Sequence, residues 1–381
     1  MQTPSGRPVR ISNVSAKASG RRVPRRAGGL ANDQVAELLA REAEKSSGIL
    51  VRAFRRAARS AFLWPEQVVD LVAQDRPLTE LRAVGPFIAK TIERWIKNPP
   101  PKVPPPLLRR DFFTLADARG LLRANEEWRN KLRGDLQMHT RYSDGSGTIA
   151  QMADAARERS YEYIAITDHS KGLKIAGGID EARLAEQQRQ IAKANVATLR
   201  RRGQVIVLSS IELNLSPKGE GDMDPRALAR LDLVLGSFHS VLRVKHDQTA
   251  RYLAALRNPQ IQILGHPRGR IYNYRLGLRA DWPRVFAEAA RLGKAVEIDC
   301  YPDRQDLNLG LLKIARREGC RISLGTDAHH PWQLEFIDLG LAAALQAKIP
   351  AERIINFMPL AELQRWVASV RARSARLRAQ R

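Results

Sequence analysis

Cysteine, acidic side chains and long apolar runs are all scarce in this sequence. Its 381 residues include two cysteines, Cys300 and Cys320, so a disulfide framework is excluded and a reducing compartment is favoured. No run of about 18 apolar residues is present, and we therefore expect no membrane span. The first residues also lack the apolar segment of a secretory signal. We expect a cytoplasmic, nucleoid-associated protein.

The shortage of acidic residues leaves a large positive charge. Lysine and arginine outnumber aspartate and glutamate by 64 to 40, which gives a formal net charge of +24. Such a surplus favours polyanions, and DNA is the partner that we expect, although a merely well-solvated basic surface is the alternative. Residues 1–29 hold seven basic residues and no acidic one, which predicts a basic disordered tail. Residues 366–381 are predicted to form a similar basic tail.

Residues 30–97 predict a small helical domain that binds DNA, because their apolar residues recur at helical spacing. The segment LTELRAVGPFIAKTIERWI predicts a helix, a turn at Ala83–Gly85 and a second helix that begins with Pro86. The backbone N–H groups of such a hairpin can bind a phosphate, with Gly85 and Lys90 as candidate contacts. The segment before it, GILVRAFRRAARS, places one basic stripe on a helix, formed by Arg52, Arg55, Arg56 and Arg59.

The rest of the chain predicts a linker and a large α/β domain. Residues 98–133 begin with a Pro-rich stretch and predict an extended linker followed by one helix. From residue 134 to residue 365, seven short apolar strands alternate with helical patterns, which is typical of parallel β–α units. Seven such units in succession predict a closed or nearly closed barrel, and an open doubly wound sheet is the alternative.

Histidines and carboxylates gather at the ends of these strands. Five of the seven histidines follow a strand directly, and the carboxyl ends of parallel strands meet on one face of a barrel. Imidazole and carboxylate ligands suit Zn²⁺, Mn²⁺ or iron, and their number predicts two or three divalent ions bridged by Glu212. The candidate ligands are His139, Asp144, His169, Glu212, His239, His266, Asp327 and His329.

Five segments together resemble the PHP (polymerase and histidinol phosphatase) domain, in the branch that ends bacterial family X DNA polymerases. In chain order they are GDLQMHTRYSDGS, YIAITDHSKGL, GSFHS, ILGHPRGR and ISLGTDAH. Residues 30–97 resemble the helix-hairpin-helix domain that begins the same polymerases. The resemblance implies a distorted seven-stranded (β/α)7 barrel preceded by a small all-α domain.

The resemblance also implies how the ligands are shared among the ions. The three implied sets are Gln137, His139, Glu212 and Asp327; Glu212, His239 and His266; and Asp144, His169 and His329. Gln137 departs from the family pattern, because histidine is usual at that position. An amide oxygen is a weaker and harder ligand than an imidazole, so we expect a complete cluster that holds the first ion loosely and favours Mn²⁺.

The function that the resemblance implies is that of a metal-dependent DNA phosphodiesterase, namely a 3′–5′ exonuclease of DNA repair. Lys171, Arg268 and Arg270 follow the ligand motifs and are candidate catalytic clamps for the substrate phosphate. Two alternatives stay open. The first is a phosphomonoesterase that acts on a small metabolite, and the second is a non-catalytic DNA-binding protein with a degenerate cluster.

We expect no polymerase activity. In those polymerases the polymerase core lies between the helix-hairpin-helix domain and the PHP domain. Here only residues 98–133 lie between the two corresponding regions, and they are too few to form that core. Asp222 and Asp224 do form an Asp-x-Asp pair, but Asp224 precedes Pro225 and is expected to cap a helix.

Overall fold

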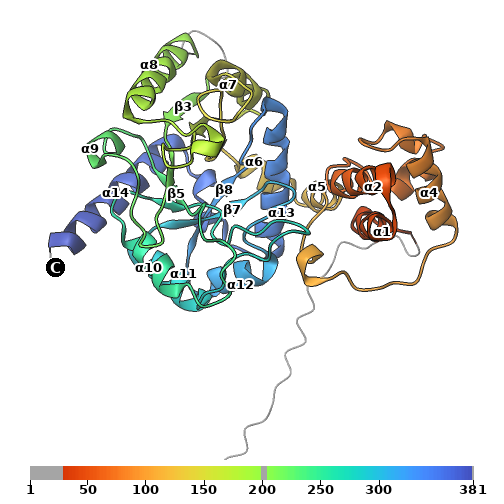
Figure 1. The fold of residues 1–381 in the computed structure, drawn as a ribbon. Helices are drawn as coiled ribbons and strands as arrows, with labels where there is room; N and C mark the ends of the chain where they lie inside the picture. The colour runs from red at the N-terminus through yellow and green to blue at the C-terminus, as the bar shows by residue number, and fades with distance from the viewer. Residues whose placement is uncertain (1–28, 199–203, 380–381) are drawn as a thin grey trace, which may run out of the picture.

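The computed structural model describes residues 29–198 and 204–379, which form a small helical unit beside a larger α/β unit (Figure 1). The tail predicted over residues 1–29 lies, except for Gly29, outside the described residues. The elements of the small unit are α1 (Asn32–Lys45), α2 (Gly48–Ser60), α3 (Val68–Ala73), η1 (Leu78–Glu80) and α4 (Pro86–Lys97). The first arm of the expected hairpin is therefore only a 3₁₀ turn, because the chain returns to an extended conformation at Leu81.

The small unit has an apolar core of its own. Trp64 and Ile92 are completely buried in it, and the indole N–H of Trp64 donates to the carbonyl oxygen of Arg82 over 3.0 Å. This bond fixes the turn that precedes α4, in which Ala83 has a positive φ of 63°. The arginine stripe expected on α2 stays on the outside of the unit, where all four side chains are exposed.

The connection between the units contains more regular structure than the sequence predicted. It contains η2 (Leu107–Arg109), α5 (Leu115–Arg123) and α6 (Glu126–Lys131). Two helices replace the single predicted helix, because Asn125 adopts non-helical dihedral angles between them. Thr114 caps α5 by accepting a hydrogen bond from the backbone N–H of Asp117.

The α/β unit is built on parallel strands. They are β1 (Gly134–Asp135), β2 (Tyr163–Ile166), β3 (Ile206–Ser209), β4 (Glu212–Asn214), β5 (Leu235–Ser237), β6 (Ile263–Leu264), β7 (Ala295–Asp299) and β8 (Arg321–Gly325). Within the described residues they form two sheets, ordered β1-β2-β3 and β4-β5-β6-β7-β8. The seven predicted strands become eight because VIVLSSIEL pairs with β2 as far as Ser209 and with β5 from Glu212 onward.

Two further bridges connect the sheets, one from the chain that follows β1 and one from the chain that follows β2. Met138 pairs with Ala328, and His169 pairs with Glu212, each in the parallel sense. Backbone bonds from His139 to Ala328 (2.8 Å) and from Glu212 to Asp168 (3.1 Å) reinforce them. The residues just after β1, β2 and β8 are thereby held side by side.

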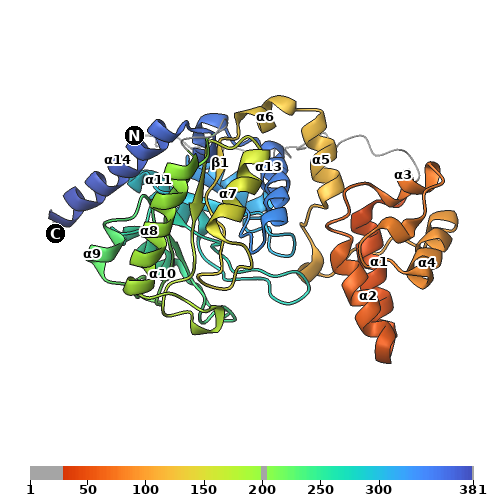
Figure 2. The same cartoon turned by 90° about the horizontal axis from the view of Figure 1, so that it is seen from above.

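Helices surround these sheets (Figures 1 and 2). They are α7 (Ile149–Glu158), α8 (Glu181–Thr198), α9 (Pro225–Leu228), α10 (Thr249–Arg257), α11 (Trp282–Leu292), α12 (Leu309–Arg317), α13 (Ile337–Gln346) and α14 (Leu360–Ala379), with 3₁₀ turns η3 (Lys174–Ala176), η4 (Pro331–Phe336), η5 (Ala351–Arg353) and η6 (Ile355–Phe357). Local signals set several ends: Thr148 and Gln151 form a capping box for α7, and Gly293 ends α11 with a φ of 71°. Among the described helices, none is both long and apolar enough to cross a membrane.

The basic tail predicted over residues 366–381 is wrong for the described part of the chain. Residues 360–379 form the single helix α14, and its apolar residues recur at helical spacing and pack against the first residues of the strands. Trp366 and Val370 are buried there, and the indole N–H of Trp366 donates to the carbonyl oxygen of Gly293 over 2.9 Å. The apolar stripe hidden among the arginines was the signal for this helix.

The two units dock through a junction of aromatic and charged side chains. Tyr272, from the loop after β6, packs in the core of the small unit, with its ring centroid 4.8 Å from Phe62 and 5.3 Å from Phe112. Next to it, Arg109 donates to both carboxylate oxygens of Glu37 (2.8 and 3.0 Å). A rigid contact of this kind holds α2 and α4 in a defined place beside the α/β unit.

One buried charge in the α/β unit leads to a pH prediction. Lys294 is 1% exposed, its ammonium group donates to the carbonyl oxygen of Asn258, and burial lowers its pKa from 10.5 to about 7. The penalty for burying the charge is fully present below the folded pKa and disappears as the pH rises through the unfolded pKa. We expect Lys294→Met to increase the free energy of unfolding by about 2 kcal/mol near pH 6 and by much less near pH 10.

Urea denaturation of wild type and variant at the two pH values measures this difference. Lys313→Met, at an exposed position of α12, is the control and should change little at either pH. An equal effect of Lys294→Met at both pH values would contradict the prediction.

Candidate metal centre

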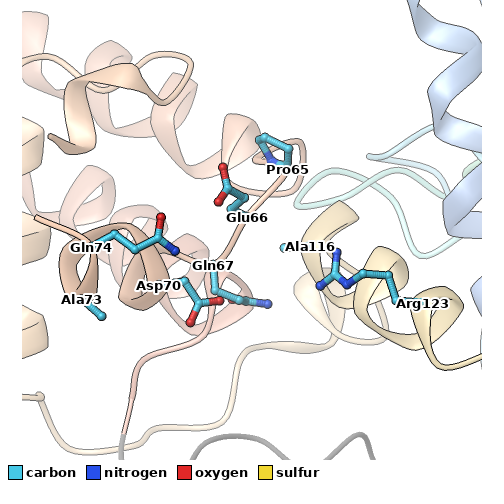
Figure 3. A pocket seen from close by; sticks show the side chains of 8 residues that line it. All are labelled: Pro65, Glu66, Gln67, Asp70, Ala73, Gln74, Ala116 and Arg123. Atoms are coloured by element: carbon cyan, nitrogen blue, oxygen red, sulfur yellow. The ribbon is translucent and has the colours of Figure 1, made fainter. Parts of the chain in front are cut away.

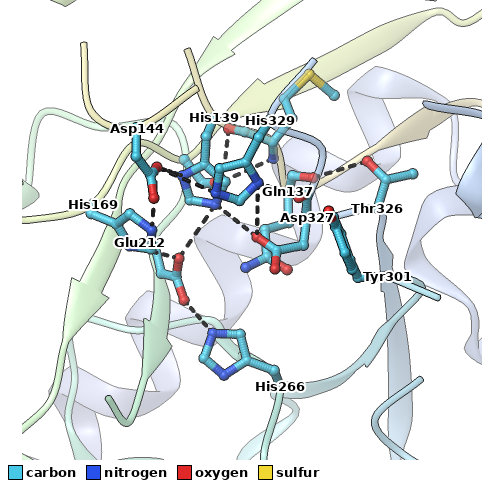
Figure 4. A network of polar contacts seen from close by, with 12 residues as sticks. Gln137, His139, Asp144, His169, Glu212, His266, Tyr301, Thr326, Asp327 and His329 are labelled. Carbon is cyan, nitrogen blue, oxygen red and sulfur yellow. Dashed lines mark hydrogen bonds and ion pairs between the residues drawn. The ribbon is translucent and has the colours of Figure 1, made fainter. Parts of the chain in front are cut away.

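The eight predicted ligands converge at one end of the parallel strands. All of them except His239 are labelled in Figure 4. Their ligand atoms fall into three groups within 4.8 Å, formed by His139, Asp144, His169 and His329; by His169, Glu212 and His239; and by His139, Glu212 and Asp327. His266 joins the second group through Glu212. The histidines of the cluster and Asp327 follow the carboxyl ends of parallel strands, which meet at one end of the sheets, whereas Glu212 begins β4 and Asp144 lies in the loop after β1.

Glu212 is the centre of this arrangement. It is completely buried, and its Oε1 lies 2.6 Å from His266 Nε2 and 3.2 Å from His239 Nε2. Its other oxygen, Oε2, lies 3.0 Å from His169 Nδ1 and 3.5 Å from His139 Nε2. One carboxylate thus faces four imidazoles, which is the geometry that the bridging role requires.

Two more carboxylates complete the cluster. Asp327 Oδ1 lies 2.9 Å from His139 Nε2, and Asp144 Oδ1 lies 3.3 Å from His329 Nε2. The His139 ring stacks on the ring of His169 and on that of His329, at centroid distances of 4.3 and 4.4 Å. Positive charge on these two neighbouring rings opposes protonation of His139.

The electrostatics of the cluster follow from these contacts. Burial opposes protonation of His266, but the Glu212 carboxylate outweighs it and raises the pKa of His266 to about 10. Burial also opposes protonation of His329, and Asp144 and Asp327 raise its pKa to about 9. For His139, burial and the neighbouring His169 and His329 lower the pKa.

The buried atoms of the cluster fit divalent cations. Four of them lack a hydrogen-bond partner among the described residues: His139 Nδ1, His169 Nδ1, His239 Nε2 and Glu212 Oε2. Buried polar atoms without a partner are unfavourable, and coordination would satisfy all four. The mixed nitrogen and oxygen donors suit Zn²⁺, Mn²⁺ or Fe²⁺.

Gln137 is completely buried beside a residue that the sequence reasoning missed, Glu297 of β7. In the hydrogen-bonding orientation of its amide, Gln137 Nε2 donates to both carboxylate oxygens of Glu297, at 2.5 and 3.0 Å. Glu297 also accepts the backbone N–H of His266 over 2.6 Å. The Gln137 carbonyl oxygen then points away from Glu297.

The three predicted phosphate clamps are engaged elsewhere. Lys171 is exposed and pairs with Glu181 at 2.7 Å, and the guanidinium of Arg268 donates to the carbonyl oxygen of Leu276. Arg270 is 4% exposed and lies 3.8 Å from the centroid of the Phe112 ring, in the junction. The sequence showed that these cations follow ligand motifs. It did not show that their side chains form contacts in the junction and at the surface instead of facing the cluster.

A different arginine reaches the cluster. Arg304, in the loop between β7 and α12, pairs with Asp327 and lies 3.9 Å from Asp299, with its guanidinium over the Tyr301 ring. Asp299 is completely buried at the end of β7, and its Oδ2 has no hydrogen-bond partner among the described residues. Asp299 obeys the same strand-end rule as the ligands and was therefore detectable, whereas Arg304 lies in a loop without a periodic pattern.

Other predicted residues occupy surfaces of the small unit. Gly85 is the N-cap of α4, and Lys90 is exposed on that helix, while the next residue, Thr91, is buried. A separate hollow with a volume of about 510 Å³ lies between α3 and α5, where Glu66, Asp70 and Arg123 face one another (Figure 3). It contains neither histidine nor cysteine and does not resemble the metal centre.

Comparison with known proteins identifies the α/β unit. A model of the PHP domain matches residues 135–296. A probable phosphatase of Photobacterium profundum is 31% identical over 206 residues, covering 51% of this chain and 77% of that protein. The chain belongs to the PHP domain family. This confirms the predicted family, and the PHP domain here carries the donor set of a metal-dependent hydrolase.

Two other matches extend the comparison. DNA polymerase/3′-5′ exonuclease PolX of Bacillus subtilis (strain 168) is 31% identical over 267 residues, 69% of this chain, and the chain spans 45% of the length of that protein. Among solved structures, a histidinol phosphate phosphatase of Lactococcus lactis in complex with zinc, L-histidinol and phosphate matches with a TM-score of 0.41. That match is 17% identical and covers 56% of this chain and 93% of the phosphatase.

Proposed function

We propose that this protein is a metal-dependent phosphodiesterase that degrades DNA from the 3′ end and has no polymerase activity. The observation that carries the proposal is the docking of a helical unit with four exposed arginines directly beside a buried His/Asp/Glu cluster. Arginine contacts to phosphates give affinity for DNA without regard to sequence. The similarity to a DNA polymerase/3′-5′ exonuclease supports the same substrate and polarity.

We further infer the fold details and the domain limits that this function uses. The two bridges between the sheets support a distorted seven-stranded barrel, in which β3 and β4 count as one strand. The turn between η1 and α4 supports a helix-hairpin-helix motif, with Gly85 and Lys90 near the phosphate. On this view the DNA-binding domain spans residues 30–97, the linker spans 98–133 and the PHP domain begins at residue 134.

Two or three divalent ions are held, in this proposal, by the eight ligands and Gln137. Bound ions of this kind supply water activation and neutralise charge on the phosphate. The side chains of the chain do the rest. Glu212 orients four imidazoles at once, and Arg304 is placed to donate hydrogen bonds to a phosphate oxygen. Arg304 thus takes the clamping role that the sequence had suggested for Lys171, Arg268 and Arg270.

The absence of polymerase activity is supported by the region between the two domains. Residues 98–133 hold only η2, α5 and α6. Asp224 caps α9 by accepting the backbone N–H of Arg226, and Asp222 accepts bonds from Ser170 and Gly172. Both members of the Asp-x-Asp pair are therefore occupied in the structure of the PHP domain.

Hydrolysis of a small phosphomonoester is the second candidate, favoured by the similarity to the probable phosphatase. The same cluster would serve, since a monoester presents the same phosphate group. The exposed arginine stripe has no role in such a reaction, so the phosphodiesterase is the better-supported function.

A nuclease assay on a 5′-labelled oligonucleotide tests the proposal. With Mn²⁺ present, wild type should give a ladder of successively shortened products, and His266→Ala should give none, because it removes an imidazole that faces Glu212. Histidinol phosphate under the same conditions tests the second candidate. DNA left intact while histidinol phosphate is hydrolysed would refute the phosphodiesterase.

A further inference from the structure

The ligands of the metal centre differ in their exposure to solvent. Glu212 and His139 are completely buried and Asp327 is 1% exposed, whereas the side chains of Asp144, His329 and His239 are 34%, 26% and 15% exposed. Asp144 and His329 are thus the ligands most open to a substrate that approaches the buried carboxylate. The residues that flank these two ligands decide which substrates enter.

Trp332 lies three residues after His329. It belongs to η4 and is 38% exposed, while the five other tryptophans are buried or half-buried. Its ring packs edge-on against Phe336, at 5.3 Å between centroids, and lies 6.3 Å from the His330 ring. The indole is held in a fixed orientation and still presents part of its surface to solvent.

An arginine from the small unit completes this site. The guanidinium carbon of Arg82 lies 5.3 Å from the centroid of the Trp332 ring. Arg82 is in turn held by Trp64, whose indole N–H donates to its backbone carbonyl. The ring and the cation come from different units, so the docked arrangement of the two units creates the pair.

A second pair of a cation and an aromatic ring lies close to the other exposed ligand. The guanidinium of Arg183 lies 5.2 Å from the centroid of the Tyr142 ring, and Tyr142 precedes Asp144 by two residues. Each of the two exposed ligands, Asp144 and His329, thus has an aromatic ring with an arginine beside it nearby in the chain.

We propose that Trp332, with Arg82 beside it, is the platform on which the unpaired terminal base of a DNA strand stacks while its phosphodiester lies in the cluster. Base–aromatic stacking with neighbouring cations is the general mode of single-strand binding, and it tolerates any base. A paired terminus cannot use the platform, because its base stays stacked within the duplex. The platform rests on the proposed function and specifies its substrate as single-stranded DNA.

Fluorescence tests the platform without requiring catalysis. A short oligothymidylate added to the full-length, inactive His266→Ala variant should quench the tryptophan emission, because the single exposed indole among the six would stack on a base. Combining His266→Ala with Trp332→Phe should remove most of this quenching. Trp128→Phe is the matched control, since Trp128 packs against Phe357 beside η6, and quenching should persist there.

A comparison of two DNA substrates tests the platform in the active enzyme. Trp332→Ala should lower kcat/KM roughly tenfold for a single strand that ends in a normal nucleotide. It should have little effect on the same strand ending in a base-free sugar, which offers nothing to stack. Trp332→Phe should restore most of the activity, and circular dichroism confirms that each variant is folded.

Distinct outcomes separate the two proposals. Equal losses for both strands, or quenching that survives Trp332→Phe, would overturn the platform. If wild type leaves DNA intact while Trp332 is still quenched by oligothymidylate, the platform stands as a binding site and the exonuclease function fails. If wild type degrades DNA without any quenching in the inactive variant, the function stands and the platform fails.

Discussion

Replacing Glu212 by glutamine should lower phosphodiester hydrolysis by at least about 1000-fold, the scale expected when the shared ligand of a multi-metal site is lost. The change keeps the volume of the side chain and removes its charge. Both oxygens of Glu212 face imidazoles, so the amide would leave at least one ring opposite an N–H group. The manganese content of the loaded protein, measured by mass spectrometry, should fall by one ion per chain or more.

Asp338→Asn provides the matched control for this variant. Asp338 is another buried carboxylate, but it lies on α13 and pairs with Arg119 and Arg129. Its replacement should reduce stability and leave the metal content unchanged. Full metal content in Glu212→Gln would contradict the bridging role, even if activity were lost.

Replacing Arg109 by methionine should lower the free energy of unfolding of the small unit by about 3–5 kcal/mol, the range observed when one partner of a buried ion pair is removed. The Arg109 side chain is 4% exposed and that of Glu37 is 10% exposed, so methionine would fill the space and leave the buried Glu37 carboxylate with only the more exposed Arg41 as a partner. Calorimetry should show a separate, lower unfolding transition for the small unit. Hydrogen exchange should rise in α1 and α2 before it rises in the strands.

Arg41→Met tests whether burial causes this effect. Arg41 pairs with the same Glu37, at 2.7 Å, but its side chain is 24% exposed and the pair is one helical turn apart. Exposed pairs of this kind contribute about 0–1 kcal/mol, so this variant should remain close to wild type. Adding Glu37→Gln to Arg109→Met should recover part of the lost stability, because the buried carboxylate would be gone and the charges left without these partners, Arg41 and Glu44, are more exposed.

The clustering of the candidate metal ligands was predictable because parallel strands fix where their last residues lie. A histidine or carboxylate that directly follows such a strand must project toward the same end as its equivalents, whatever the loops do. His139, His169, His239 and His266 could be found by this rule, without any knowledge of the connecting helices. The rule also extends to Asp299, which ends β7 and was overlooked.

The cations around the cluster could not be predicted in the same way. Arg270 follows a ligand motif closely, yet Phe112 of the linker draws it into the junction. Arg304 reaches the cluster because its neighbour Gln305 bonds both the N–H and the carbonyl of Phe113, at 2.8 Å each, across 192 positions of the chain. Contacts over such separations leave no local pattern in the sequence.

Two helical segments account for the remaining differences between the predicted and the observed secondary structure. In α14 the arginines dominate the composition, and the residues that pack on the strands are spread through them at helical spacing. The first arm of the hairpin shows the opposite case, since Pro77 and the extended Leu81 leave room for only a 3₁₀ turn. Composition is a weak guide where a helix is either fully basic on one face or only one turn long.

The exposed Pro-rich stretch after α4 has a consequence for how such proteins are assembled. Residues 98–106 are largely exposed, whereas the chain on either side is anchored, by the core of the small unit before it and by Arg109 after it. An additional domain inserted within this stretch would extend into solvent and leave the contacts on either side unchanged, because long insertions in exposed loops are tolerated at small entropic cost. The same two-part architecture is therefore compatible with chains of very different length.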